Sequence, residues 1–237
     1  MKNKLLNEIK IDWDYRDLDP EGKGAVSKIN LETHPNPFIF TEDKRIIQAF
    51  AHLHNGKHLI IPELNPTILY LSSSQEILNT TIQLKAQLLE LAGVKNYIQT
   101  SELFIRFFPQ LSLLITSLFT AIEAFNNGLI PDDFSYHQKG KYLNKVKIQR
   151  WIKFKEKTEQ VIPEIFNRSF VVDFPKKYET ICEIKNLRDD IIHTKNRYQG
   201  MASYRDIYKN SLLIDFENAY QITCDYINFY DPNLIEE

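Results

Sequence analysis

The spacing of apolar residues changes character near residue 72. Before this point, short apolar runs are interrupted by five of the chain's ten prolines. Beyond it, apolar residues recur at intervals of three and four over long stretches, which is the period of an amphipathic helix. We therefore predict a mainly α protein: a small N-terminal α/β addition over residues 1–72 and a bundle of about five helices over residues 73–237.

The N-terminal region is predicted to mix one helix with short strands. Thr41 is a plausible N-cap for a helix that stops at Asn55-Gly56, because an Asn-Gly pair ends helices readily. Two apolar runs then follow on either side of a proline-rich connection, and both have strand character. They are His58–Ile61 and Thr67–Leu71.

Two long helices open the second region. A capping box at Ser73–Glu76 starts a helix that Gly93 stops, and a second helix runs from Thr100 or Ser101 to Asn126-Asn-Gly128. Pro109 should kink or divide the second helix, since proline removes a backbone donor. The run Leu111–Ile122 is apolar nearly all round, which predicts a central buried helix that is too short to span a bilayer.

Three later helices complete the prediction. One begins near Lys145 and turns Ile148, Trp151 and Ile152 towards the core. Another begins after Asp173-Phe-Pro175, and a last one runs from a second capping box at Ser203–Asp206 to Tyr230.

Composition adds few constraints on function. The chain has 237 residues, 43% of them hydrophobic, and a formal net charge of −2, so any affinity for nucleic acid must come from a local patch. Cys182 and Cys224 are too few for a disulfide framework and are expected to be reduced. The polar stretch at the start of the sequence is not expected to act as a signal peptide. We expect a cytoplasmic protein without a membrane segment.

One segment is strongly basic. Residues 137–158 carry eight Lys and Arg residues against a single Glu. A helical projection from Lys145 gathers four of these cations on the side away from the core, where they could follow the phosphate backbone of RNA. The other interpretation is a solvated face that maintains solubility. The four candidate RNA-binding residues are Lys147, Arg150, Lys153 and Lys157.

The stretch Asn186–Lys195 carries the most distinctive chemistry. Arg188 is a permanent cation with a planar fork that suits phosphate oxygens, and His193 can transfer a proton near neutral pH. Five residues of straight helix separate them by roughly 140° of rotation and about 7.5 Å of rise. One copy could bring them together only if the helix ended between them, whereas two copies related by a two-fold axis would place both pairs in one cleft. A homodimer is therefore expected.

At these residues the chain resembles the HEPN superfamily of helical domains, whose motif is an Arg, a polar residue directly after it, and a His four to six residues beyond the Arg. The matching positions are Arg188, Asp189 and His193. The stretch Thr120–Asn127 is similar to the "IEAF-N" sequence on an earlier helix of many such proteins. The resemblance covers roughly residues 73 to 231. It implies a metal-independent endoribonuclease that works as a dimer without a cofactor, often in toxin–antitoxin or antiphage systems, although some members lack the activity.

The resemblance assigns roles to individual residues. His193 would act as general base or general acid, Arg188 would stabilise charge on the phosphate, and Asp189 would orient one of them. Glu123, with Asn126, would support the site. If Glu123 is buried, it needs a partner such as Arg188; the other interpretation is a solvated carboxylate on the last turn of its helix. The alternative is purely structural: Arg188 pairs with Asp190 or another acid, and His193 interacts with the C-terminal end of its helix.

Other classes of function remain to be weighed. A non-catalytic HEPN-like module could bind RNA, an antitoxin or a subunit of a defence complex without cleaving anything. No metal site is expected, because the Asn-Gly pair separates His54 from His58 and no Cys or carboxylate pair completes a set with His52. A nucleotide-dependent enzyme lacks support, because there is no Gly-rich phosphate loop.

Overall fold

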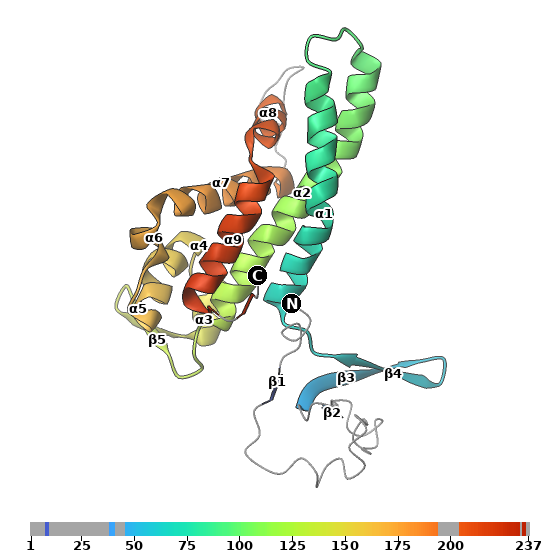
Figure 1. The fold of residues 1–237 in the computed structure, drawn as a ribbon. Helices are drawn as coiled ribbons and strands as arrows, with labels where there is room; N and C mark the ends of the chain where they lie inside the picture. The colour runs from blue at the N-terminus through green and yellow to red at the C-terminus, as the bar shows by residue number, and fades with distance from the viewer. Residues whose placement is uncertain (1–7, 10–37, 41–45, 194–203, 233, 236–237) are drawn as a thin grey trace. The chain divides into compact units, whose positions relative to one another are not determined.

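The computed structural model describes residues 8–9, 38–40, 46–193, 204–232 and 234–235 (Figure 1). The chain is mainly helical with a small strand region, as predicted. It divides into two units, residues 1–68 and 69–237, each considered by itself below. The sequence prediction placed the division after residue 72.

The described part of the first unit is a small antiparallel sheet built on one long strand, β3 (Ile46–His54). The start of β3 pairs with β1 (Glu8–Ile9) and β2 (Phe38–Phe40), and the rest of it pairs with β4 (Lys57–Pro62). The strand predicted at His58–Ile61 is thereby confirmed.

The helix predicted from Thr41 to Asn55-Gly56 is wrong. Thr41 itself lies outside the described residues, but Ile46–His54 is a strand. Asn55 and Gly56 both have positive φ, 49° and 74°, as the two-residue turn of a tight β-hairpin requires. An Asn-Gly pair suits such a turn as well as it suits the end of a helix.

Helix α1 (Pro66–Glu90) begins before the predicted capping box. Pro66 occupies its first position, and the Asn65 side chain accepts a hydrogen bond from the Thr67 backbone N–H at 3.0 Å. Thr67–Leu71 is therefore helical, and the prediction of a strand there is wrong. Ser73–Glu76 lies inside the helix, where the Ser73 hydroxyl donates back to the carbonyl of Leu69 at 3.0 Å.

Helix α2 (Tyr97–Gly128) is the core of the second unit. It starts where Asn96 caps the N–H of Gln99 and continues past Pro109 without dividing. Apolar side chains from Phe107 to Phe125 are buried along it, which confirms the predicted central helix. By length and composition alone the whole of α2, although not the run Leu111–Ile122 by itself, could cross a membrane. Its packing against α7 and α9 is equally that of the core helix of a soluble protein.

Short elements connect α2 to the next long helix. They are β5 (Ser135–Gln138), β6 (Lys141–Asn144), α3 (Lys145–Trp151), α4 (Phe154–Glu156), the π-helical turn η3 (Lys157–Val161), α5 (Ile162–Phe166) and α6 (Phe170–Asp173). The continuous helix predicted from Lys145 is wrong, because Ile152 has an extended backbone with ψ of 127° and ends α3. Ile148 and Ile152 are buried as expected, but Trp151 is exposed.

The remaining helices are α7 (Pro175–Ile192), α8 (Arg205–Leu213) and α9 (Phe216–Tyr230). Helix α7 begins at the predicted proline and packs on α2 and α9. The single last helix predicted from Ser203, which lies outside the described residues, is divided. Ile214 is extended, and the Asp215 side chain caps α9 by accepting from the Asn218 N–H at 3.0 Å.

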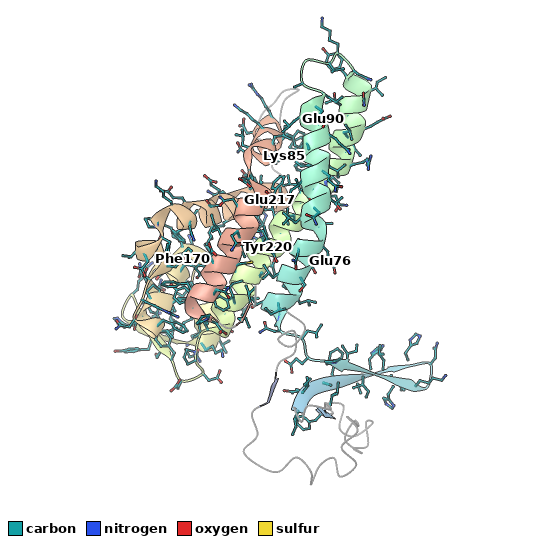
Figure 2. All side chains as sticks on the ribbon, in the orientation of Figure 1. Glu76, Lys85, Glu90, Phe170, Glu217 and Tyr220 are labelled. Atoms are coloured by element: carbon teal, nitrogen blue, oxygen red, sulfur yellow. The ribbon has the colours of Figure 1, made fainter. Side chains whose placement is uncertain are left out.

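Lys85 of α1 supports this break between α8 and α9. Its ammonium donates to the Ile214 carbonyl at 2.6 Å and lies 4.8 Å from the centre of the Phe216 ring. Figure 2 labels Lys85 on α1 and Glu217 in the first turn of α9. The carbonyl exposed where α8 ends thus finds a charged donor instead of water. The contact ties α1 to the C-terminal helices.

Candidate functional site

Arg188 lies on the side of α7 that faces α2. Its guanidinium carbon is 5.2 Å from the centre of the Phe119 ring, and Nη2 is 3.7 Å from Oε2 of Glu123. The ion pair expected between Arg188 and Glu123 is therefore present. The Glu123 side chain retains 42% of its exposure, so the charge pair sits at the edge of the helix interface and water reaches it.

Asp189 holds the same guanidinium from the neighbouring position. Its carboxylate accepts from Arg188 Nη1 at 3.0 Å and from Lys185 Nζ at 2.8 Å. Partial burial raises the pKa of Asp189, but the hydrogen bonds and charges of Lys185 and Arg188 outweigh burial and leave the pKa below its usual value. Asp189 therefore remains ionised at neutral pH and holds the Arg188 guanidinium by a hydrogen-bonded ion pair.

His193 is the residue at which α7 ends. Its backbone N–H donates to the Asp189 carbonyl at 2.9 Å, and its side chain is exposed. The helix thus ends between Arg188 and His193, but no contact between their side chains is found among the described residues. The structure brings Arg188, Asp189 and Glu123 together and leaves His193 apart from them.

The structural alternative matches part of this geometry. Arg188 is paired with two acids, Glu123 on α2 and its chain neighbour Asp189. His193 stands at a helix C-terminus, where a positive charge is favoured.

Asn126 does not join the site. It is fully buried, and its Oδ1 accepts a hydrogen bond of 2.6 Å from the hydroxyl of Tyr226 on α9. Complete burial raises the pKa of Tyr226 well above its usual value, so its hydroxyl stays protonated and donates. Asn126 is thus a core residue that joins α2 to α9, and its predicted supporting role is corrected.

The buried Asn126–Tyr226 bond should matter for stability. Replacing Tyr226 with Phe removes the donor and leaves the buried Asn126 oxygen without this partner, which is expected to cost about 1–3 kcal/mol in the free energy of unfolding. Urea denaturation measures the cost. Tyr70→Phe, at an exposed position of α1, serves as the control and should change stability by less than about 0.5 kcal/mol.

The basic segment is divided between surface and interior. Lys147 and Arg150 are exposed on α3, and Lys153 is exposed just beyond it. Lys157 is only 7% exposed, and its ammonium donates to Asn127 Oδ1 at 2.7 Å and to the Gln149 carbonyl at 3.4 Å. Burial lowers the pKa of Lys157, and the negative charge of Glu123 partly opposes this shift. Lys157 is therefore not part of a surface that binds RNA.

Two neighbours of Arg188 were missed by the sequence argument. Phe119 lies under the guanidinium, and Lys185 shares the Asp189 carboxylate. Both stand four residues before a predicted site residue, Glu123 and Asp189 respectively, so each shares a helix face with it. This four-residue spacing could have identified Phe119 and Lys185 as neighbours of the site from the sequence.

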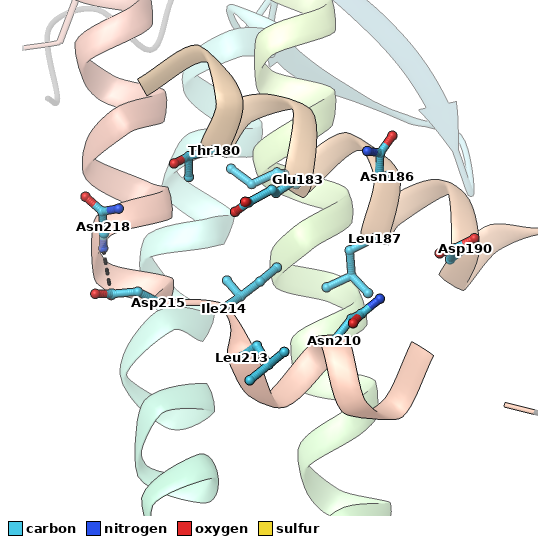
Figure 3. A pocket seen from close by; sticks show the side chains of 11 residues that line it. Thr180, Glu183, Asn186, Leu187, Asp190, Asn210, Leu213, Ile214, Asp215 and Asn218 are labelled. Atoms are coloured by element: carbon cyan, nitrogen blue, oxygen red, sulfur yellow. Dashed lines mark hydrogen bonds between the residues drawn. The ribbon is translucent and has the colours of Figure 1, made fainter. Parts of the chain in front are cut away.

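A separate pocket of about 500 Å³ lies between α7 and the α8–α9 break (Figure 3). Asn186 and Asp190 line it, and each is two residues from Arg188, or roughly 200° around the helix. Glu183 and Asp215 add further carboxylates to its lining. An acidic wall repels phosphate, so this pocket is not the place where RNA would react.

The three described histidines of the first unit do not share one face of the sheet. His52 and His54 alternate along β3 and share one face, whereas His58 is paired with Leu53 and lies on the other. Within the described residues, no group of three His, Cys, Asp or Glu side chains could hold a metal ion. A protein that works without metal remains a prediction.

Comparison of the chain with protein-family models, with curated proteins and with solved structures finds no match. The resemblance to HEPN domains therefore rests on Arg188, Asp189, His193 and the Thr120–Asn127 stretch.

Proposed function

We propose that this protein is a metal-independent endoribonuclease of the HEPN type that acts as a dimer in the cytoplasm. One observation carries the proposal: the guanidinium of Arg188 is held by Glu123 and Asp189, five residues before an exposed histidine at the end of the same helix. Phosphodiester cleavage requires an oriented cation and a proton-transfer group, and one chain supplies both at the same end of α7.

The reaction follows from these two side chains. His193 takes the proton from a ribose 2′-hydroxyl or supplies one to the departing 5′-oxygen. The 2′-oxygen attacks phosphorus, the bond from phosphorus to the 5′-oxygen breaks, and a 2′,3′-cyclic phosphate remains. Arg188 stabilises the charge that builds on the phosphate oxygens. Its 3.7 Å contact with Glu123 is longer than its contact with Asp189, so a phosphate would compete first for the Glu123 side.

The dimer supplies what one chain lacks. The side chains of Arg188 and His193 are not in contact within the described structure, and a two-fold axis near the end of α7 would place both pairs in one cleft. Such an enzyme suits a toxin or antiphage effector, with an antitoxin or defence-complex protein as a possible partner. It requires no cofactor.

The exposed cations of α3 provide a place for the RNA strand. Lys147 and Arg150 lie three residues apart on one helix face, and Lys153 follows the helix end. None of the three forms an ion pair with a described residue, so all are available to phosphates.

The second candidate is a non-catalytic HEPN-like module that binds RNA or a partner protein. The engagement of Arg188 with two carboxylates favours it, because these ion pairs need no substrate to explain them. The two candidates differ in whether binding leads to cleavage.

Expression in cells separates them. The wild-type chain is expected to arrest growth and shorten cellular RNA, whereas His193→Ala is expected to be tolerated at equal protein levels. Growth is followed after induction, and RNA length is checked on denaturing gels. Equal toxicity of both chains, or toxicity without RNA shortening, would favour the non-catalytic module.

A further inference from the structure

An exposed aromatic pair lies on the β5–β6 hairpin, outside the site described above. Tyr142 is 74% exposed and stands opposite His137 in the antiparallel register, with ring centres 5.0 Å apart. The next pair along, Tyr136 and Leu143, points to the other face, where Tyr136 is buried and donates to Gln160 at 2.7 Å. The hairpin is thus anchored through one face and presents aromatic rings on the other.

A second exposed ring lies on α3. Trp151 is 72% exposed and follows Lys147 by four residues, so these two side chains are neighbours on one helix face. Arg150 flanks Lys147 on its other side, three residues along the helix. The buried Ile148 and Ile152 fix α3 from beneath. Nothing in the packing of the described residues explains the exposure of a tryptophan among cations.

The hairpin and α3 are joined without a flexible linker. Asn144, the last residue of β6, caps α3 by accepting from the Lys147 N–H at 3.2 Å. Two residues of extended chain, Leu143 and Asn144, and one short helix separate Tyr142 from Trp151, so their backbones are within roughly 20 Å of each other. A short nucleic-acid strand can span such a distance.

The charged residues of the segment that carries the two rings are all Lys or Arg. Residues 137–153 contain no Asp or Glu. Lys145 is paired with Asp132, but the other cations of this stretch form no ion pair with a described residue. Lys139 sits at the hairpin tip with a φ of 50°, which is unusual for lysine and holds its side chain out at the turn. The unpaired cations are Lys139, Lys141, Lys147, Arg150 and Lys153.

We propose that Tyr142 and Trp151, set among these cations, form a platform on which unpaired RNA bases stack. Exposed rings with interspersed Lys and Arg are how proteins hold single strands: the cations follow the backbone, and the rings take the bases. A duplex keeps its bases stacked internally and offers them no free face. The proposal rests on the proposed function for the choice of RNA, and it makes unpaired segments the substrate class.

The test measures binding apart from cleavage. All variants carry His193→Ala, and fluorescently labelled 12-nucleotide unpaired RNA is compared with a duplex of the same length by anisotropy. Tyr142→Ala and Trp151→Ala are each expected to weaken binding of the unpaired strand by roughly 5- to 100-fold and that of the duplex by less than about 2-fold. Tyr97→Ala removes a ring of similar exposure, 77%, from the start of α2 and should bind like the parent.

A spectroscopic readout checks direct contact. Trp13 and Trp151 are the chain's two tryptophans, so a Trp13→Phe background leaves Trp151 as the sole source of tryptophan fluorescence. Unpaired RNA is expected to quench this fluorescence as its bases stack on the indole. Variants are compared only after thermal melts show that they fold like the parent.

The outcomes separate the platform from the nuclease. Affinity for unpaired RNA that survives loss of both rings, equal losses on the duplex, or no binding by the parent would overturn the platform. Dependence on the rings in a wild-type chain that cleaves no RNA would keep the platform and remove the nuclease. If RNA is cleaved at the same rate with and without the Tyr142 and Trp151 rings, the nuclease stands and the platform is removed.

Discussion

Replacing His193 with Ala is expected to reduce RNA cleavage by roughly 10²- to 10⁴-fold, the usual contribution of a general acid or base. Arg188→Ala should lower it by roughly 10²- to 10³-fold, because a cation that stabilises the transition state is lost. Both rates are measured with purified protein under single-turnover conditions. The fold should survive, since His193 is exposed and the Arg188 ion pairs lie at a solvated edge.

Matched controls make this result specific. His58→Ala removes an exposed histidine on β4, and Arg106→Ala removes an exposed arginine on α2 outside the Glu123 contact. Both should cleave at the wild-type rate. Full activity in Arg188→Ala and His193→Ala would end the catalytic assignment, and equal losses in the controls would point to a general effect on folding.

Mixing the two inactive variants should restore activity if the site is shared between subunits. Random exchange makes about half of the dimers mixed, and each mixed dimer has one intact Arg188 and one intact His193 in the common cleft. Activity should therefore rise well above that of either variant, towards a ceiling of about half the wild-type value. Cleavage is measured after the mixture has been incubated long enough for subunits to exchange.

A second mixture controls for this rescue. His193→Ala combined with a double variant that lacks both side chains contains no intact histidine and should stay inactive. If exchange is demonstrated by mass but the first mixture also stays inactive, Arg188 and His193 must act within one chain. The end of α7 at Ile192 would then be what allows them to meet.

The long helices were predictable because their signals are local and repeated. The apolar run of α2 and the proline that opens α7 hold in the structure, as does the pairing of Glu123 with Arg188. Short apolar stretches were not predictable in the same way. Ile46–His54 fits a helix or a strand by pattern alone, and only its pairing with β4 decides.

The candidate site shows the limit of helical projections. A face drawn through Lys147 and Lys157 assumes one straight helix, and the extended backbone at Ile152 breaks it. Lys157 then turns inward to Asn127, and Trp151 turns outward. Tertiary packing ends the helix at Ile152, and no residue next to it is a sequence signal for a helix end. Asn126 was misassigned for a related reason, since the direction of its side chain depends on where α9 packs.

The most direct test of the central claim is incubation of the purified protein with structured RNAs in EDTA, beside the His193→Ala variant, followed by analysis of the product ends. Cleavage by the wild type alone, leaving 2′,3′-cyclic phosphate ends, is the predicted result. A folded dimer that leaves every RNA intact would contradict the account, as would cleavage that EDTA abolishes or that His193→Ala retains.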